Sequence, residues 1–223
     1  MGVEHESAWI HATFRPDSPY LTLEQPNLTR YLDWGYDHDA DSNGVNRAAR
    51  ATARLGNYWM LKGERGRPEV LAHLARALAA ARRNNDRLGE ANTLRAIGDA
   101  QQFRKEIDAT LRSYEAALPP YRALGDRLGE ANTLAALSRL HLDVDPTTSR
   151  QLLEQALTLR RMINDRYSEG ADLGNYGIAL LQRGRNAEAL PYLQRAREVF
   201  AALQIAHLVE MMDRLIAQAS ASG

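Results

Sequence analysis

Lysine, histidine and serine occur in this chain, but not at the spacings that nucleotide binding or hydrolysis requires. A phosphate-cradling P-loop needs a lysine after glycine and before serine or threonine. Lys62 follows Leu61 and Lys105 follows Arg104, so neither lysine fits. Zinc-protease chemistry needs two histidines four positions apart, and serine hydrolases need a Gly-x-Ser-x-Gly elbow. No such elbow occurs, and the histidines are His5, His11, His38, His73, His141 and His207. The sequence therefore predicts a protein that is not an enzyme and has no nucleotide cofactor.

One segment resembles the start of a calcium loop. "DADSNG", Asp39 to Gly44, places side-chain oxygens at alternate positions. The twelfth position, where a bidentate glutamate closes the calcium shell, is Arg50, and a cation there would repel the metal. The chain contains no cysteine, which excludes thiolate metal sites and disulfides and fits a reducing cytoplasm. We predict a polar connecting loop here and no metal site.

Composition and charge indicate a soluble, folded, helical protein. The chain is 44% hydrophobic and 25% charged, and its 28 basic side chains balance 28 acidic ones. Because no overall basic field exists to hold a polyphosphate backbone, we expect no direct nucleic-acid partner. No apolar run reaches the length of a membrane span, and the first residues lack a signal-peptide core. A cytoplasmic protein without a membrane partner is the expectation.

The elements that position any binding residues are repeated. "DRLGEANTL" occupies Asp86 to Leu94 and returns at Asp126 to Leu134, and "DRYSEGADL" keeps its frame at Asp165 to Leu173. A small residue lies three or four positions after each leucine, and alanines recur about 40 residues apart at Ala77, Ala117, Ala156 and Ala196. A fixed period of this length indicates one supersecondary unit stacked several times.

Each repeat has the pattern of two helices. Asp86, Asp126 and Asp165 are predicted to cap the first helices, and the glutamates four positions later lie in their first turns. Gly98, Ser138 and Gly177 mark close helix approach, whereas Pro119 and Pro120 would bend or shorten a second helix. Arg82–Arg83 and Arg160–Arg161 end second helices, where cations balance the helix dipole. Neither capping nor core packing accounts for the amides of Asn92 and Asn132.

The pattern predicts four units, a closing helix and short flanking segments. The fold class is all-α, a right-handed α-solenoid of antiparallel helix pairs. Residues 204–218, with Met211 and Met212, should cover the last unit's apolar face. The divisions are a lead-in at 1–45, units at 46–83, 87–123, 127–162 and 166–202 within an array of 46–203, the closing helix at 204–218, and a disordered tail at 219–223.

These units resemble tetratricopeptide repeats. The likeness is clearest in "LGNYGIALLQRGRNAEALPYLQRAREVF", and the turns such as "ALGDRLGEA" are similar to those of repeats in large signalling proteins. Before the array, "LEQPNLTRYLDWGYDH" and "LGNYWMLKGERGRPEVLAHLARAL" are similar to the junction of STAND-class signalling ATPases. The residues that carry the second likeness are Glu24, Asn27, Leu28, Trp34, Tyr58, Trp59 and Gly63. These resemblances imply a sensor arm, or a free-standing relative of one.

The resemblance also implies where a partner binds. In tetratricopeptide repeats the first helices line an inner wall that holds an extended peptide or a partner's helix. On that geometry the wall residues are Arg50, Asn57, Asn92, Arg95, Asp99, Asn132 and Arg139. Asn and Arg present paired hydrogen-bonding groups suited to backbone amides and carboxylates. We expect a protein or peptide ligand and a monomer or weak homodimer, with self-assembly as the alternative function.

Overall fold

The computed structural model describes residues 68–221, and in this part of the chain every regular element is an α-helix. Helices are joined by turns of two to five residues, and the helices that pair with one another run antiparallel. The described helices are α5 (Pro68–Arg83), α6 (Arg87–Phe103), α7 (Ile107–Leu124), α8 (Arg127–Leu140), α9 (Pro146–Met162), α10 (Arg166–Leu181), α11 (Asn186–Ala202) and α12 (Ala206–Ala221). The all-α, solenoid-like prediction is confirmed.

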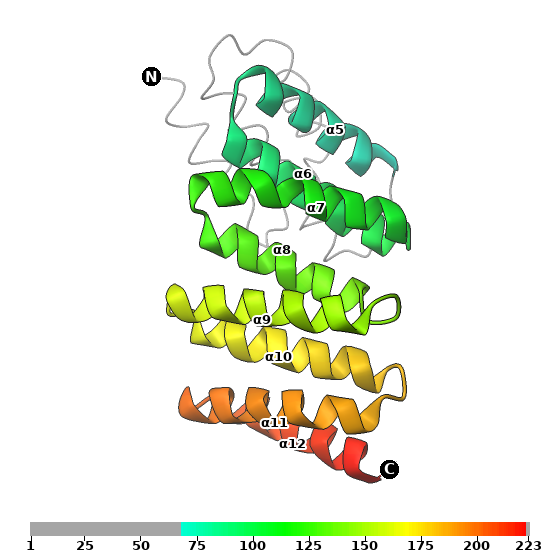
Figure 1. The fold of residues 1–223 in the computed structure, drawn as a ribbon, viewed down its shortest axis with the longest axis vertical. Coiled ribbons are helices and arrows are strands. Elements are labelled where there is room, and N and C mark those ends of the chain that lie inside the picture. The colour runs from blue at the N-terminus through cyan, green and yellow to red at the C-terminus, as the bar shows by residue number, and fades with distance from the viewer. Residues whose placement is uncertain (1–67, 222–223) are drawn as a thin grey trace, which may run out of the picture. The chain divides into compact units, whose positions relative to one another are not determined.

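The chain divides into two compact units between Leu124 and Gly125. In the first unit α6 packs against both α5 and α7. In the second unit α8 pairs with α9 and α10 with α11, and α12 packs on α11 (Figure 1). The expected units 87–123, 127–162 and 166–202 each coincide with one such helix pair. The lead-in at 1–45, the calcium-like segment and the junction residues from Glu24 to Gly63 lie outside the described residues.

The repeated nonapeptide starts a helix and packs it. Asp86 Oδ1 accepts from the backbone N–H of Gly89 at 2.9 Å, and Asp126 makes the same bond to Gly129 at 3.0 Å. Asp165 likewise accepts from Ser168 N at 3.1 Å, so the three predicted caps are confirmed. The residue before each cap has a left-handed backbone, with φ of 54°, 66° and 57° at Asn85, Gly125 and Asn164. This conformation ends the preceding helix, which explains the turns "ND" and "GD".

Small residues lie where paired helices approach most closely. A Cβ on Gly98 would lie 2.6 Å from the Tyr114 ring, and one on Gly177 would lie 2.7 Å from Leu193 Cδ2. Ser138, in the equivalent position of α8, is fully buried. The recurring alanines are also completely buried: Ala77, Ala117, Ala156 and Ala196. The residues that recur about every 40 positions in the sequence are therefore the ones that pack in the core of each helix pair.

The last helix closes the second unit. Met212 is buried in the core formed by α9, α10 and α11, and Leu208, Val209, Leu215 and Ile216 pack against it. The apolar face predicted for the closing helix thus has its partner. Pro119 and Pro120 lie inside α7, which continues to Leu124 without interruption, so they do not shorten it. Within residues 68–221 no helix is long and apolar enough to span a bilayer.

Candidate binding surface on the first helices

In the first unit, one face of α6 carries a half-exposed polar row. Asn92, Arg95 and Asp99 follow one another at helical spacing, so they share that face. Arg95 Nη1 lies 3.1 Å from Asp99 Oδ2, and the two side chains are 31% and 21% exposed. The pair keeps a guanidinium and a carboxylate in fixed positions while both remain open to solvent.

Two tyrosines of α7 hold this row from beneath. Tyr114 and Tyr121 are buried, and their hydroxyl groups reach the α6 face. The Tyr114 hydroxyl donates to Asp99 Oδ1 at 2.7 Å, and the Tyr121 hydroxyl donates to Asn92 Oδ1 at 2.8 Å. Burial alone would lower the pKa of Arg95, but Asp99 and the Tyr121 hydroxyl outweigh it and raise that pKa. The row is therefore a preorganised surface with a permanent positive charge at its centre.

In the second unit, the corresponding face of α8 is supported by an arginine instead. Arg160 of α9 has a side chain only 3% exposed, and its Nη2 donates to Asn132 Oδ1 at 2.7 Å. The same guanidinium contacts Asp172 at 2.9 Å and Asp165 at 3.2 Å. Arg139 donates to the carbonyl of Ala135 in its own helix at 2.9 Å. Asn132 and Arg139 are both half-buried.

These contacts overturn the expectation that the architecture makes no use of the asparagine amides. Tyr121 and Arg160 each lie four residues after a buried alanine of the repeat, so they hold the same position in successive units. Each donates to the asparagine that holds the same position in the first helix. In the third copy of this arrangement the two positions are Ala171 and Phe200. The asparagines therefore join the two helices of a unit, and they satisfy buried donors as well as facing the surface.

The carboxyl group of Asp172 in this cluster has a raised pKa. Burial raises its pKa, and the attraction of Arg160 opposes that rise without cancelling it. The carboxylate is held by Arg160 Nε at 2.9 Å, and the charge of Arg139 lies close enough to act on it as well. In the second unit, the charged side chain of Arg160 therefore joins α9 to α8 and α10. In the first unit, the neutral hydroxyl groups of Tyr114 and Tyr121 join α7 to α6.

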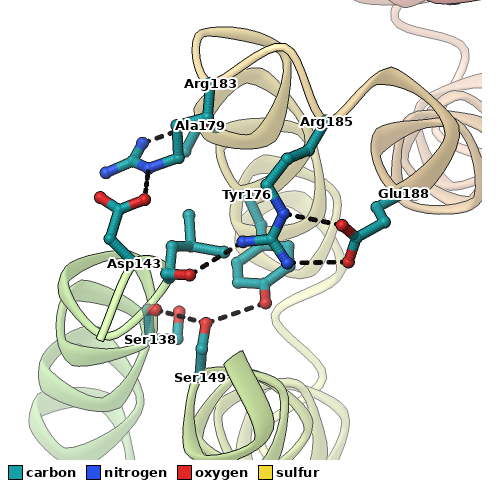
Figure 2. A network of polar contacts seen from close by, with 9 residues as sticks. Ser138, Asp143, Ser149, Tyr176, Ala179, Arg183, Arg185 and Glu188 are labelled. Carbon is teal, nitrogen blue, oxygen red and sulfur yellow. Dashed lines mark hydrogen bonds and ion pairs between the residues drawn. The ribbon is translucent and has the colours of Figure 1, made fainter. Parts of the chain in front are cut away.

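A second polar network ties the helix pairs of the second unit together at their other end (Figure 2). Ser149 Oγ lies 2.6 Å from the carbonyl of Ser138 and 2.8 Å from the Tyr176 hydroxyl. Arg185 donates to the carbonyl of Leu142 at 2.8 Å and to both carboxylate oxygens of Glu188. Arg183 likewise reaches across to Asp143. The side chains of this network bind one another across the helices, so the network holds the α8–α9 pair against the α10–α11 pair.

An open hollow of about 520 Å³ lies between α8 and α9. Leu134 and Leu159 contribute apolar surface, and Gln151, Glu154 and Gln155 contribute polar groups. Glu154 already pairs with Arg195 at 3.0 Å. Among residues 68–221 no cluster of three or more His, Asp or Glu side chains is placed to hold a metal ion.

Two of the predicted surface residues, Arg50 and Asn57, fall outside the described residues. Of the others, Asn92, Arg95 and Asp99 form one row, and Asn132 and Arg139 lie in the second unit. Sequence reasoning missed the supporting residues, which are Tyr114, Tyr121, Arg160 and Asp172. The signal for two of them was available, because Tyr121 and Arg160 follow the recurring alanines at a constant offset.

Comparison with known proteins identifies the architecture and no family. No protein-family model matches this chain, and no curated protein matches it. Among solved structures, a similar chain is BtubC (BKLC) from P. vanneervenii, with a TM-score of 0.66 and 13% sequence identity. The match covers 91% of this chain and 90% of that one. At this identity the likeness concerns the fold alone, a helical repeat-like arrangement.

Proposed function

We propose that this chain is a non-enzymatic module that binds a protein or peptide segment on the exposed face of its first helices. The observation that carries the proposal is the row Asn92, Arg95 and Asp99. Its side chains are locked by buried tyrosines, yet a guanidinium and a carboxylate remain open to solvent. Side chains that are already ordered lose little conformational entropy when a partner binds.

The chemistry of the row suits a polar backbone and acidic side chains. The N–H groups of Arg95 that do not bind Asp99 or Tyr121 can donate to a carboxylate. The amide N–H₂ of Asn92 can donate to a peptide carbonyl while its oxygen stays bonded to Tyr121. Asp99 restricts the choice further, because it disfavours an acidic group at its own end of the row. A segment that places an acidic residue near Arg95 and a donor near Asp99 fits best.

The repeat pattern supports a narrower version of this proposal. The helix pairs fit tetratricopeptide repeats, and the segment before them is similar to the junction of STAND-class ATPases. On this version the chain is the sensor arm of a signalling regulator in the cytoplasm. A nucleotide-binding segment with a P-loop encoded next to this array in the gene would support it. Calorimetry with ATP and magnesium should give no saturable heat with this chain.

The alternative function, self-assembly by open-ended stacking, is less favoured by the last helix. The outward side chains of α12 are polar, including His207, Glu210, Asp213 and Arg214, so a second array finds no apolar face to continue there. Light scattering that shows concentration-dependent filaments would reverse this preference.

The binding surface is tested by selecting from a displayed library of random dodecapeptides on the immobilised chain. At least one class of enriched peptides should bind Arg95→Gln more weakly than the parent chain. Arg104→Gln is the matched control, since Arg104 is also about a third exposed and pairs with a neighbouring carboxylate, Glu106. If no enriched class of peptides binds Arg95→Gln more weakly than it binds Arg104→Gln, the α6 row is not the binding surface.

A further inference from the structure

Large apolar side chains are exposed at one edge of the second unit. Leu128, Met162 and Tyr167 are 51%, 55% and 56% exposed. Leu128 lies in the first turn of α8, Met162 ends α9, and Tyr167 lies in the first turn of α10. Because successive helices are antiparallel, the start of α8, the end of α9 and the start of α10 lie at the same edge.

Hydrogen bonds between the helices fix this register. Arg160 binds Asn132 of α8, which places the last turn of α9 beside the second turn of α8, one turn from Leu128. Arg161 binds Glu169 of α10 at 2.8 Å, which places the same turn beside the first turn of α10. The tilted contact of Tyr167 with Phe200, at 6.1 Å between ring centroids, holds the exposed aromatic ring on the core beneath it.

Cationic side chains accompany these apolar ones. Arg161 and Arg166 are both 44% exposed and both bind Glu169, whose side chain is only 5% exposed. One buried carboxylate thus holds two exposed guanidinium groups. The exposed carboxylate of Glu154 lies 4.0 Å from Arg161 but 3.0 Å from Arg195, which it binds more closely. The solvent-facing charge at the α9–α10 turn is therefore positive. Arg127, next to Leu128, is also exposed. We call this set the edge patch, and its members are Arg127, Leu128, Arg161, Met162, Arg166 and Tyr167.

We propose that the edge patch binds an acidic segment of another protein in which carboxylates alternate with apolar side chains. The apolar residues of such a segment would cover Leu128, Met162 and Tyr167, and its carboxylates would meet the three arginines. Arginine favours this role because its planar fork binds carboxylates with two hydrogen bonds while its stem covers apolar surface. Neither the apolar side chains nor the arginines alone specify this partner, but the two together do.

The same observations disfavour other anionic partners. Binding to nucleic acid depends on many neutralised phosphates, and this patch carries three arginines of which two share Glu169. Polybasic segments that hold membranes carry about four to eight basic residues, more than are gathered here. Neither partner would use the alternation of charged and apolar side chains along the edge.

The experiment uses the full chain and a displayed library of random dodecapeptides, followed by fluorescence anisotropy with the best synthetic peptide. The charge variant is Arg127→Gln/Arg166→Gln, which leaves Arg161 to hold the buried Glu169. Its matched control is Arg104→Gln/Arg197→Gln, because these arginines are 34% and 43% exposed and pair with carboxylates outside the patch, Glu106 and Asp213. The apolar variant is Leu128→Ser/Met162→Ser, and its control is Val144→Ser in the α8–α9 turn, at the opposite end of α9.

The expected result is a class of peptides rich in Asp, Glu and large apolar residues. The charge variant should weaken the binding of these peptides at least about fivefold, and rising salt should weaken their binding to the parent chain. The apolar variant should weaken it comparably, and both controls should bind as the parent does. Arg95→Gln should leave this class unaffected, so failure here is distinguishable from failure of the α6 surface.

Three outcomes would overturn the proposal. The first is a library that yields no acidic and apolar class. The second is equal binding by the charge variant and its control. The third is displacement of the peptide by an equally charged single-stranded DNA at equal concentration, which would show a general anion site. Thermal melts of all variants must first show that each is folded as the parent is.

Discussion

The side-chain oxygen of Asn132 lies 2.7 Å from Nη2 of Arg160, a guanidinium almost completely removed from solvent. One unit earlier, Asn92 accepts from Tyr121 in the equivalent position, and one unit later Ala171 and Phe200 take the two places. A single structural slot therefore accepts a neutral polar pair, a charged polar pair or an apolar pair. The fold requires only that the two side chains in this slot are both polar and hydrogen-bonded or both apolar.

This matching predicts the result of a double-mutant cycle at Asn92 and Tyr121. Asn92→Ala leaves the buried Tyr121 hydroxyl without this acceptor and should lower the free energy of unfolding by about 1 kcal/mol. Tyr121→Phe alone leaves an unpaired amide at a half-exposed site and should cost less. The double variant, which approaches the Ala171 and Phe200 pair, should cost less than the sum of the two single changes. Urea denaturation measures all four states, and strict additivity would show that the hydrogen bond contributes nothing.

At Asn132 the cost of truncation should be larger. Asn132→Ala removes an acceptor from a buried guanidinium, and we expect a loss of about 1–3 kcal/mol, more than for Asn92→Ala. The comparison of the two single variants by urea denaturation is the measurement. An equal or smaller loss at Asn132 would mean that Asp165 and Asp172 satisfy Arg160 by themselves.

Two glycines of different surroundings should respond to alanine in opposite directions. At Gly98 the added Cβ would meet the Tyr114 ring at 2.6 Å, so Gly98→Ala should destabilise the chain by about 1–3 kcal/mol. At Gly174 the nearest atom, Met212 Sδ, is 3.4 Å away, an ordinary contact. Gly174→Ala should instead stabilise α10 by up to about 1 kcal/mol through helix propensity. Thermal melts that rank the two variants in the reverse order would contradict the close approach at Gly98.

Replacing Gln204, in the turn before α12, by glycine should stabilise the chain. Gln204 has a φ of 58°, a left-handed conformation that costs a side chain about 1 kcal/mol and costs glycine nothing. Gln204→Gly should therefore raise the melting temperature by a few degrees. Gln182→Gly is the control, because Gln182 has a φ of −59° and gains nothing from glycine. An unchanged or lowered melting temperature for Gln204→Gly would show that its side chain contributes more than the strain costs.

Acid should act on Asp145 and Asp172 in opposite ways. The Thr148 hydroxyl and backbone N–H groups lower the pKa of Asp145, whereas burial raises that of Asp172. The contribution of Asp145 is therefore present above its unfolded pKa and is lost as pH falls through its folded value. For Asp172 the sign is reversed, because ionisation is penalised in the folded state: its contribution is present at low pH and is lost as pH rises through the folded pKa.

NMR titration of the two carboxyl carbons is the direct measurement, with Asp145 expected below and Asp172 above the usual aspartate value of about 3.9. Asp145→Asn and Asp172→Asn should then remove opposite slopes from the dependence of melting temperature on pH. If both carboxyl groups titrate at the usual value, the cap and the buried cluster do not act on them as described.

The sequence by itself determined the architecture, because the signals that specify it are local and repeated. A cap such as Asp126, a left-handed residue such as Gly125 and a buried alanine such as Ala156 each act within one or two turns of helix. Their recurrence about every 40 residues reveals the unit, and the apolar face of α12 reveals the end of the stack. Only the tertiary structure decided what the polar side chains do. Asn132 and Arg160 are 28 residues apart in the chain, and their contact depends on the rotation of one helix against another. Periodicity identifies which residues share a face, but it does not identify the donor that comes within 3 Å of an acceptor on the neighbouring helix.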